Sequence, residues 1–187
     1  MKHFWKAAVM WGLALWFLGY LLGFVFHGLV PPDEIGWHIM PIGVVATLWV
    51  LFKRIRSTSL GYYFGVAVVW TAIAIVFDYL FIALLLHPSD GYYKPDVYLY
   101  YTLTYTLPLA FGLFGRGRFI EAEKRTKVLN LFTGGTEVTN DMVQKALGVS
   151  DATATRYLDA LERTGDIVQL GSTGSGVVYR RNSKATA

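Results

Sequence analysis

The apolar positions of this chain are unevenly distributed. They form four long runs before Gly115, whereas the remaining sequence alternates apolar and polar positions over short intervals. A helix needs about 20 mainly apolar residues to cross the hydrocarbon core of a bilayer, and the four runs approach or exceed this length. They cover residues 7–26, 35–52, 60–86 and 97–114. The pattern therefore predicts four membrane-spanning helices followed by a part that folds in water.

Basic residues between these runs predict how the helices are oriented, because Lys and Arg collect on the cytoplasmic side of a membrane. All but one of those near the expected helices lie on the same side: Lys2, Lys6, Lys53, Arg54, Arg56, Arg116 and Arg118. The alternate segments, residues 27–34 and 87–96, hold four acidic residues and only Lys94. We therefore expect a multi-pass protein of the cell membrane with both termini in the cytoplasm.

Three helices and a hairpin are expected after residue 118. Apolar residues recur at helical spacing, and the hydroxyls of Thr139 and Ser150 can cap the second and third helices. Two apolar runs around a glycine-rich loop then predict a hairpin. The expected elements are helices over 122–132, 140–147 and 151–163 and strands over 166–170 and 177–180. The chain would thus hold a transmembrane domain, residues 1–118, and a cytoplasmic domain, residues 119–187.

The segment VSDATATRYLDALERTG, residues 149–165, resembles the recognition helix of winged helix-turn-helix domains. Such domains occur in prokaryotic transcription regulators and at the C-terminus of some Fic-type proteins, and the resemblance covers roughly the last third of the chain. It implies a mainly α protein, in which a four-helix transmembrane bundle precedes a small winged helix-turn-helix domain. The implied function is that of a membrane-tethered transcription regulator that binds double-stranded DNA.

The recognition helix places candidate DNA contacts on one face. With Ala154, Leu158 and Leu161 turned to the core, Arg156 lies on the opposite face and is suited to guanine O6 and N7. Neighbouring small and hydroxyl side chains can reach bases or phosphates, and Arg180 follows the expected wing. The full set of expected DNA contacts is Thr139, Ser150, Ala152, Thr153, Thr155, Arg156 and Arg180.

Two features leave a second function open. Asp151 and Asp159 flank Arg156 and repel phosphate, and the expected wing, residues 172–176, contains no Lys or Arg. The net charge of +4 permits nucleic-acid binding without arguing for it. Because a fold does not set a function, the domain could instead dock a protein partner, and a homodimer is compatible with either function.

Asp78 is the one charged residue well inside an expected span, where a carboxylate is costly and often functional. Three histidines lie at the outer ends of three different spans, and imidazole with carboxylate can bind a divalent cation or titrate near neutral pH. The expected sensing residues are Asp78, His27, His38, His87 and Tyr101. The alternative is a structural Asp78 that is hydrogen-bonded to a Tyr or Thr hydroxyl.

Two groups of glycines predict further features of the helices. Gly19 and Gly23 form a G-x-x-x-G pair that would let another helix approach closely, within the chain or in a dimer. Residues 115–118 form a short connection with two glycines, which we expect to interrupt the helix and to be too short for a long flexible tether.

The sequence contains no motif that would support an enzymatic function. The absence of cysteine excludes disulfides and thiolate chemistry, and the sequence holds no P-loop, no H-E-x-x-H and no G-x-S-x-G. We expect no cofactor and no resident metal. A small transporter with a regulatory domain is the third alternative, although one buried carboxylate makes a sparse pathway.

Overall fold

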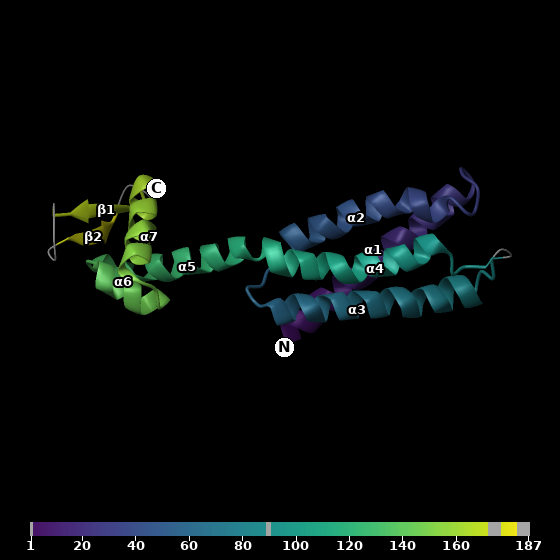
Figure 1. Ribbon diagram of the computed structural model, residues 1–187, viewed down its shortest axis with the longest axis horizontal. Helices are drawn as coiled ribbons and strands as arrows, with labels where there is room; N and C mark the ends of the chain where they lie inside the picture. Colours follow the sequence, from purple (N-terminus) through teal and green to yellow (C-terminus); the bar gives the residue numbers. More distant parts are fainter. Residues whose placement is uncertain (1, 89–90, 172–176, 183–187) are drawn as a thin grey trace. The chain divides into compact units, whose positions relative to one another are not determined.

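A change of composition near residue 115 coincides with a division of the fold. The computed structural model describes residues 2–88, 91–171 and 177–182. It separates the chain into two units, residues 1–117 and 118–187, here called the N-terminal unit and the C-terminal unit. The described residues are mainly helical, as the sequence predicts, and contain one two-stranded sheet (Figure 1).

The N-terminal unit consists of helices that follow the apolar runs. They are α1 (Lys2–His27), α2 (Ile35–Lys53), α3 (Leu60–Asp78) and α4 (Pro95–Ala110). Two π-helical segments, η1 (Tyr79–Leu84) and η2 (Phe111–Gly115), directly continue α3 and α4. Helix α1 packs against α2 and α3, and α4 packs against the same two helices (Figure 1).

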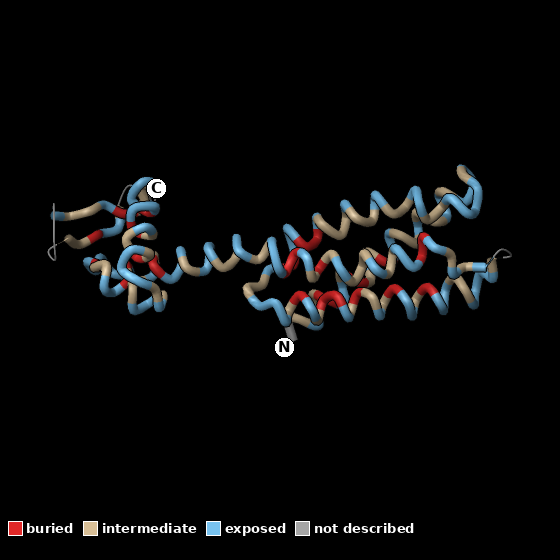
Figure 2. The backbone as a smooth tube through the Cα atoms, viewed as in Figure 1, coloured by how far each residue is buried: buried red, intermediate tan, exposed pale blue. Residues whose placement is uncertain are grey.

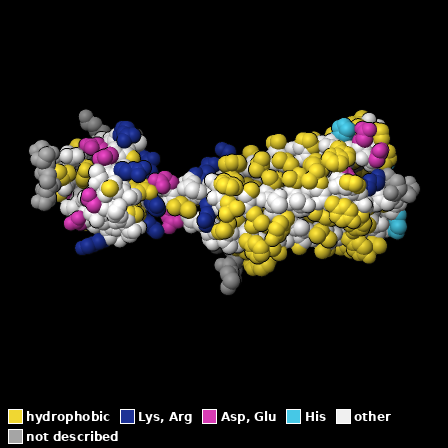
Figure 3. Space-filling view, viewed as in Figure 1, with side chains coloured by type: hydrophobic (Ala, Val, Ile, Leu, Met, Phe, Trp, Pro, Cys, Tyr) yellow, Lys and Arg dark blue, Asp and Glu magenta, His cyan; other side chains and the backbone are white. Residues whose placement is uncertain are grey.

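Three helical segments are long and apolar enough to cross a membrane: Phe4–His27, Ile35–Lys53 and Leu60–Leu84. Only 11% of the most apolar stretch of Phe4–His27 is buried inside the protein. Hydrophobic side chains accordingly cover much of the visible face of the N-terminal unit (Figure 3). Soluble proteins rarely expose so continuous an apolar surface, which is compatible with a membrane protein.

The C-terminal unit begins with a helix and ends with the hairpin. Its elements are α5 (Gly117–Leu131), η3 (Thr133–Gly135), α6 (Asn140–Leu147), α7 (Asp151–Arg163), β1 (Ile167–Leu170) and β2 (Val178–Arg181). The strands pair antiparallel, with Ile167 opposite Arg181. Val138, between η3 and α6, exchanges two backbone hydrogen bonds of 2.8 and 2.9 Å with Tyr179. The hairpin therefore has a third, single-residue partner that the sequence pattern did not predict.

One apolar cluster holds the C-terminal unit together. Helix α7 contributes Ala154, Leu158 and Leu161, which are 0 to 3% exposed, as the helical spacing predicts. The other buried members come from every remaining part of the unit: Val128, Phe132, Val138, Val143, Ile167 and Tyr179. Figure 2 marks the buried positions of this unit in red along its helices and strands. One face of α7 is therefore buried in this core.

The capping residues behave differently from one another. The hydroxyl of Thr139 accepts a hydrogen bond from the backbone N–H of Met142 at 3.4 Å, which confirms it as the cap of α6. Gly148, at φ +64°, ends α6 in the left-handed region that glycine adopts without strain. Ser150 precedes α7 as predicted, but its hydroxyl lies 3.2 Å from the Thr153 hydroxyl and caps no backbone N–H. The predicted side-chain cap at Ser150 is therefore wrong.

The connection at residues 115–118 also differs from its prediction. Helix η2 continues to Gly115 and α5 already begins at Gly117, five positions before the expected start at residue 122. A glycine costs a helix only about 1 kcal/mol relative to alanine, which is too little to stop helices with favourable neighbours on both sides. Only Arg116 separates the two helices, and its guanidinium donates to the Thr58 carbonyl oxygen at 3.3 Å.

Candidate functional site

The outward face of α7 presents Arg156 to solvent. Arg156 and Ala152 are exposed and Thr153 is half-buried, whereas the core-facing side chains of the same helix are buried. Among the described residues, no acidic side chain pairs with the Arg156 guanidinium. This side chain can therefore reach a partner molecule without first breaking an ion pair.

Thr155 has a different environment from the one that the sequence suggested. Its hydroxyl accepts a hydrogen bond from the Asn140 side-chain amide at 2.7 Å, and the Gln144 amide donates to Asn140 Oδ1 at 2.6 Å. This network connects α6 to α7 through side-chain hydrogen bonds. Sequence reasoning missed Asn140 and Gln144, although their i, i+4 spacing places both on one face of α6.

Arg180 is exposed, but it is already paired. Its guanidinium donates to Glu137 Oε1 at 2.5 Å. Glu137 directly precedes Val138, which bridges to the hairpin. Part of its charge is therefore compensated, and it is a weaker candidate for phosphate than Arg156. The expected wing, residues 172–176, lies outside the described residues.

Acidic side chains share the exposed side of α7. Asp151, Asp159 and Glu162 are exposed, as are Arg156 and Arg163. The surface is thus mixed in sign. What distinguishes it is Arg156, whose guanidinium pairs with no acidic side chain in the described part of the chain. Arg156 lies close to the first turn of α7, where backbone N–H groups attract anions.

A second polar centre lies among the helices of the N-terminal unit. Asp78, at the end of α3, is only 3% exposed. Trp16 Nε1 donates to Asp78 Oδ1 at 2.7 Å, and the Tyr101 hydroxyl donates to Oδ2 at 2.9 Å. The Tyr92 hydroxyl interacts with the same carboxylate. Asp78 is therefore hydrogen-bonded to a Tyr hydroxyl, and no basic side chain among the described residues pairs with it.

Tyr92 lies in the segment between η1 and α4. Its burial and the adjacent Asp78 carboxylate raise the pKa of this phenol above its ordinary value. Tyr92 therefore stays protonated and can act as a donor to Asp78. Neither Tyr92 nor Trp16 was recognised from the sequence, because no local spacing relates them to Asp78.

A cavity of about 460 Å³ adjoins this carboxylate. It lies where the end of α1, the start of α2, the end of α3 and the start of α4 meet. Its aromatic lining comes from Trp16, Tyr20, Phe24, Tyr92 and Tyr100. Its ionisable lining consists of Asp78, Asp96, His27 and Lys94. The size is that of a small-molecule site.

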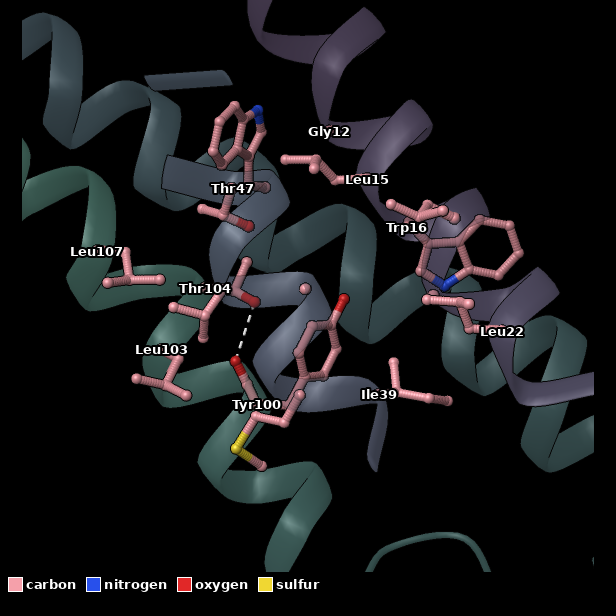
Figure 4. A pocket seen from close by; sticks show the side chains of 16 residues that line it. Gly12, Leu15, Trp16, Leu22, Ile39, Thr47, Tyr100, Leu103, Thr104 and Leu107 are labelled. Carbon is pink, nitrogen blue, oxygen red and sulfur yellow. Dashed lines mark hydrogen bonds between the residues drawn. The ribbon is translucent and has the colours of Figure 1, made fainter. Parts of the chain in front are cut away.

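A smaller cavity of about 60 Å³ lies beside the first and shares Trp16 and Tyr100 with it. Figure 4 shows Tyr100, Leu103 and Leu107 of α4 on one side of this space and Trp16 of α1 on another. The Thr104 hydroxyl donates to the Tyr100 carbonyl oxygen at 2.9 Å (Figure 4). The smaller space is therefore mainly apolar.

The predicted sensing histidines do not gather around Asp78. Only His27 lines the large cavity. His38 is exposed, with Nδ1 2.9 Å from the Glu34 carbonyl oxygen, and His87 is exposed three residues after the end of η1. Within the described ranges, no three His, Asp or Glu side chains form a group that could hold a metal ion. The arrangement therefore supports neither a histidine cluster nor a divalent-cation site.

Gly19 and Gly23 do not mark a close helix contact in this structure. A Cβ atom at either position would have no described atom within 4 Å, and both glycines line the large cavity. The close approach occurs at Gly12, where a Cβ would lie 2.7 Å from Ile73 and 2.8 Å from Trp70. The first helix therefore packs on α3 through Gly12.

Comparisons of the chain with protein-family models, with curated proteins and with solved structures find no match.

Proposed function

We propose that this chain is a membrane-tethered DNA-binding regulator. Its N-terminal unit would cross the membrane four times and its C-terminal unit would bind duplex DNA as a winged helix-turn-helix domain. The observation that carries the proposal is the combination of apolar helices with a separate unit that presents Arg156 on one exposed helix face, with no acidic partner among the described residues.

The fourth span of this proposal is α4 with its continuation η2. The two segments contain 16 and 5 residues, which at about 1.5 Å per residue approach the ~30 Å of a hydrocarbon core. Three threonine hydroxyls of α4 donate to carbonyl oxygens four positions earlier, at 2.8 to 2.9 Å: Thr102, Thr104 and Thr106. These bonds reduce the cost of placing hydroxyls in an apolar medium.

Reporter fusions test the orientation. The distribution of Lys and Arg predicts that a reporter after Ala187 is cytoplasmic and that one inserted beside Asp90 is external. A matched insertion at Ser57, between α2 and α3, should be cytoplasmic. An external reporter after Ala187 would exclude a regulator that meets DNA in the cytoplasm.

The winged-helix proposal is supported by the order of elements. Helices α6 and α7 are joined by residues 148–150, a turn of the length and glycine content that helix-turn-helix motifs use. The hairpin follows α7, and the bridge from Val138 to Tyr179 connects it to the segment before α6. In such domains the N-terminal part of the second helix enters the major groove, which is where Arg156 lies.

A binding experiment with duplex DNA tests the function. The unit 118–187 and the full chain in lipid nanodiscs should both shift a mixed pool of duplexes at low salt. The logarithm of the affinity should fall linearly with the logarithm of salt, with a slope of about −0.9 per phosphate contact. If neither sample binds DNA at low salt, the DNA-binding proposal is wrong and the alternative is favoured, in which the exposed face of α7 docks a protein through residues such as Asp151 and Asp159.

A further inference from the structure

We propose that the cavity beside Asp78 binds a small organic cation of the quaternary-ammonium type. This proposal concerns the N-terminal unit alone and does not depend on DNA binding. It rests on four features of one site: its volume, its two buried carboxylates, its aromatic lining and the hydrogen bonds that Asp78 already accepts.

The charge of the lining favours a cation. Asp78 and Asp96 are 3% and 7% exposed, and both line the cavity. Lys94 is the one lysine or arginine among the described lining residues, so the carboxylates outnumber it. A buried carboxylate that has only neutral donors leaves a negative potential in its surroundings, which a bound cation compensates.

The hydrogen bonds of Asp78 select the kind of cation. An ionised carboxylate has about four lone-pair sites, and the donors from Trp16, Tyr101 and Tyr92 use most of them. A primary ammonium group or a hydrated metal ion needs several acceptors and would find few free acceptor sites on Asp78. A quaternary ammonium group donates no hydrogen bond and is attracted by charge alone.

The aromatic lining fits the same ligand. Trp16 stacks on Tyr20 with ring centroids 5.1 Å apart, and Phe24 contacts Tyr20 edge to face at 4.9 Å. These rings form a continuous wall along α1, and Tyr92 and Tyr100 line the cavity from the region of α4. Aromatic groups attract weakly hydrated cations through their electron-rich faces. The wall therefore adds affinity for an alkylated ammonium group beyond the charge of Asp78.

The glycines of α1 provide the space. Gly19 and Gly23 both line the cavity, and neither would bring a Cβ within 4 Å of a described atom. A larger side chain at Gly23 would thus occupy the cavity without displacing a neighbouring helix. This position allows the site to be filled while Asp78 and its donors remain intact.

The experiment compares choline with its uncharged carbon isostere dimethylbutanol. Both are titrated calorimetrically into the full chain in nanodiscs of phosphatidylglycerol. Choline should bind with an affinity at least about tenfold higher than the isostere, because the two differ only in the charge that faces the carboxylates. Equal affinities, or no choline binding, would overturn the proposal.

Three variants assign the binding to this cavity. Asp78→Asn should weaken choline binding at least about tenfold and leave the isostere unchanged. Gly23→Leu should abolish the binding of choline, whereas Gly28→Leu, outside the cavity and also in open space, should retain it. If Asp78→Asn fails to fold, the pair at Gly23 and Gly28 decides. Unchanged choline binding in Gly23→Leu would also overturn the proposal.

Nanodiscs of phosphatidylcholine distinguish two sources of the same chemistry. If choline headgroups of lipids occupy the cavity, the apparent affinity for free choline falls when phosphatidylcholine replaces phosphatidylglycerol. If the ligand is a free cation, the affinity is the same in both lipids. Both results support a quaternary-ammonium site if the isostere fails to bind. If the isostere binds as well as choline, the proposal is wrong in either lipid.

Discussion

The indole nitrogen of Trp16 lies 2.7 Å from Oδ1 of Asp78, although the two residues are 62 positions apart. The bond joins α1 to α3 at a point where Asp78 is shielded from solvent. A buried acceptor that loses its donor keeps its desolvation cost without compensation. The donor from Trp16 therefore compensates part of the cost of burying the Asp78 carboxylate.

Replacing Trp16 by Phe should destabilise the N-terminal unit by roughly 1 to 3 kcal/mol. The ring still packs against Tyr20 and Phe77, while the donor to Asp78 is lost. Reversible unfolding of the full chain in mixed detergent measures the difference. Trp37→Phe is the matched control, because Trp37 is half exposed, and it should change the stability little. Equal losses in the two variants would contradict a specific role of the Trp16 bond.

Whether a feature could be predicted from this sequence depends on how far apart in the sequence the interacting residues lie. Local periodicity was sufficient for Ala154, Leu158 and Leu161, because one helix face decides which side chains are buried. Thr139 was likewise recognisable as a cap because its acceptor role depends on a neighbour three positions later. Both predictions are confirmed.

The missed contacts depend on segments that are distant in sequence. The donor from Trp16 to Asp78 and the bridge from Val138 to Tyr179 arise only when helices or strands pack. The pair Gly19 and Gly23 shows the same limit, because the spacing that permits a close helix contact also permits an open cavity wall. Local spacing could not distinguish these outcomes.

Replacing Leu158 by Ala should destabilise the C-terminal unit by about 2 to 5 kcal/mol. Leu158 is fully buried in the cluster that joins α5, α6, α7 and the hairpin. Chemical denaturation of the unit 118–187 measures the change. Val168→Ala in β1 is the control, since Val168 is 44% exposed and should cost less than about 0.5 kcal/mol. A stable Leu158→Ala unit would show that this cluster is not the core.

Replacing Arg156 by Ala should weaken sequence-specific DNA binding by about 1 to 3 kcal/mol and leave the unfolding midpoint unchanged. The expected loss follows from the position of Arg156 on the exposed face of α7, where the guanidinium is accessible to a partner molecule. Arg163→Ala is the matched control, because Arg163 lies at the C-terminal end of the same helix and should cost less. Binding curves for both variants at one salt concentration make the comparison. If the two variants bind alike, the N-terminal half of α7 does not read the bases.

Replacing Gly36 by Ala should destabilise the N-terminal unit by about 1 to 3 kcal/mol, the usual cost of overpacking. The added Cβ would lie 1.8 Å from Asp96 Oδ2 and 2.8 Å from its Cγ, so the short Asp96 side chain must leave its place. That place is against the first turn of α2, where the helix dipole favours a carboxylate. Gly43→Ala is the control on the same helix, because its Cβ meets no described atom within 4 Å and should be neutral or stabilising.

The double variant Gly36→Ala with Asp96→Ala separates the clash from other effects of the new methyl group. Truncating Asp96 removes the two closest atoms and leaves only its Cβ, 3.3 Å from the new methyl. Gly36→Ala should then cost much less in the Asp96→Ala background than in the native chain, and unfolding of all four proteins measures this coupling. An equal cost in both backgrounds would mean that Asp96 does not lie against Gly36, and the lining of the cavity at this end of α2 would have to be reassigned.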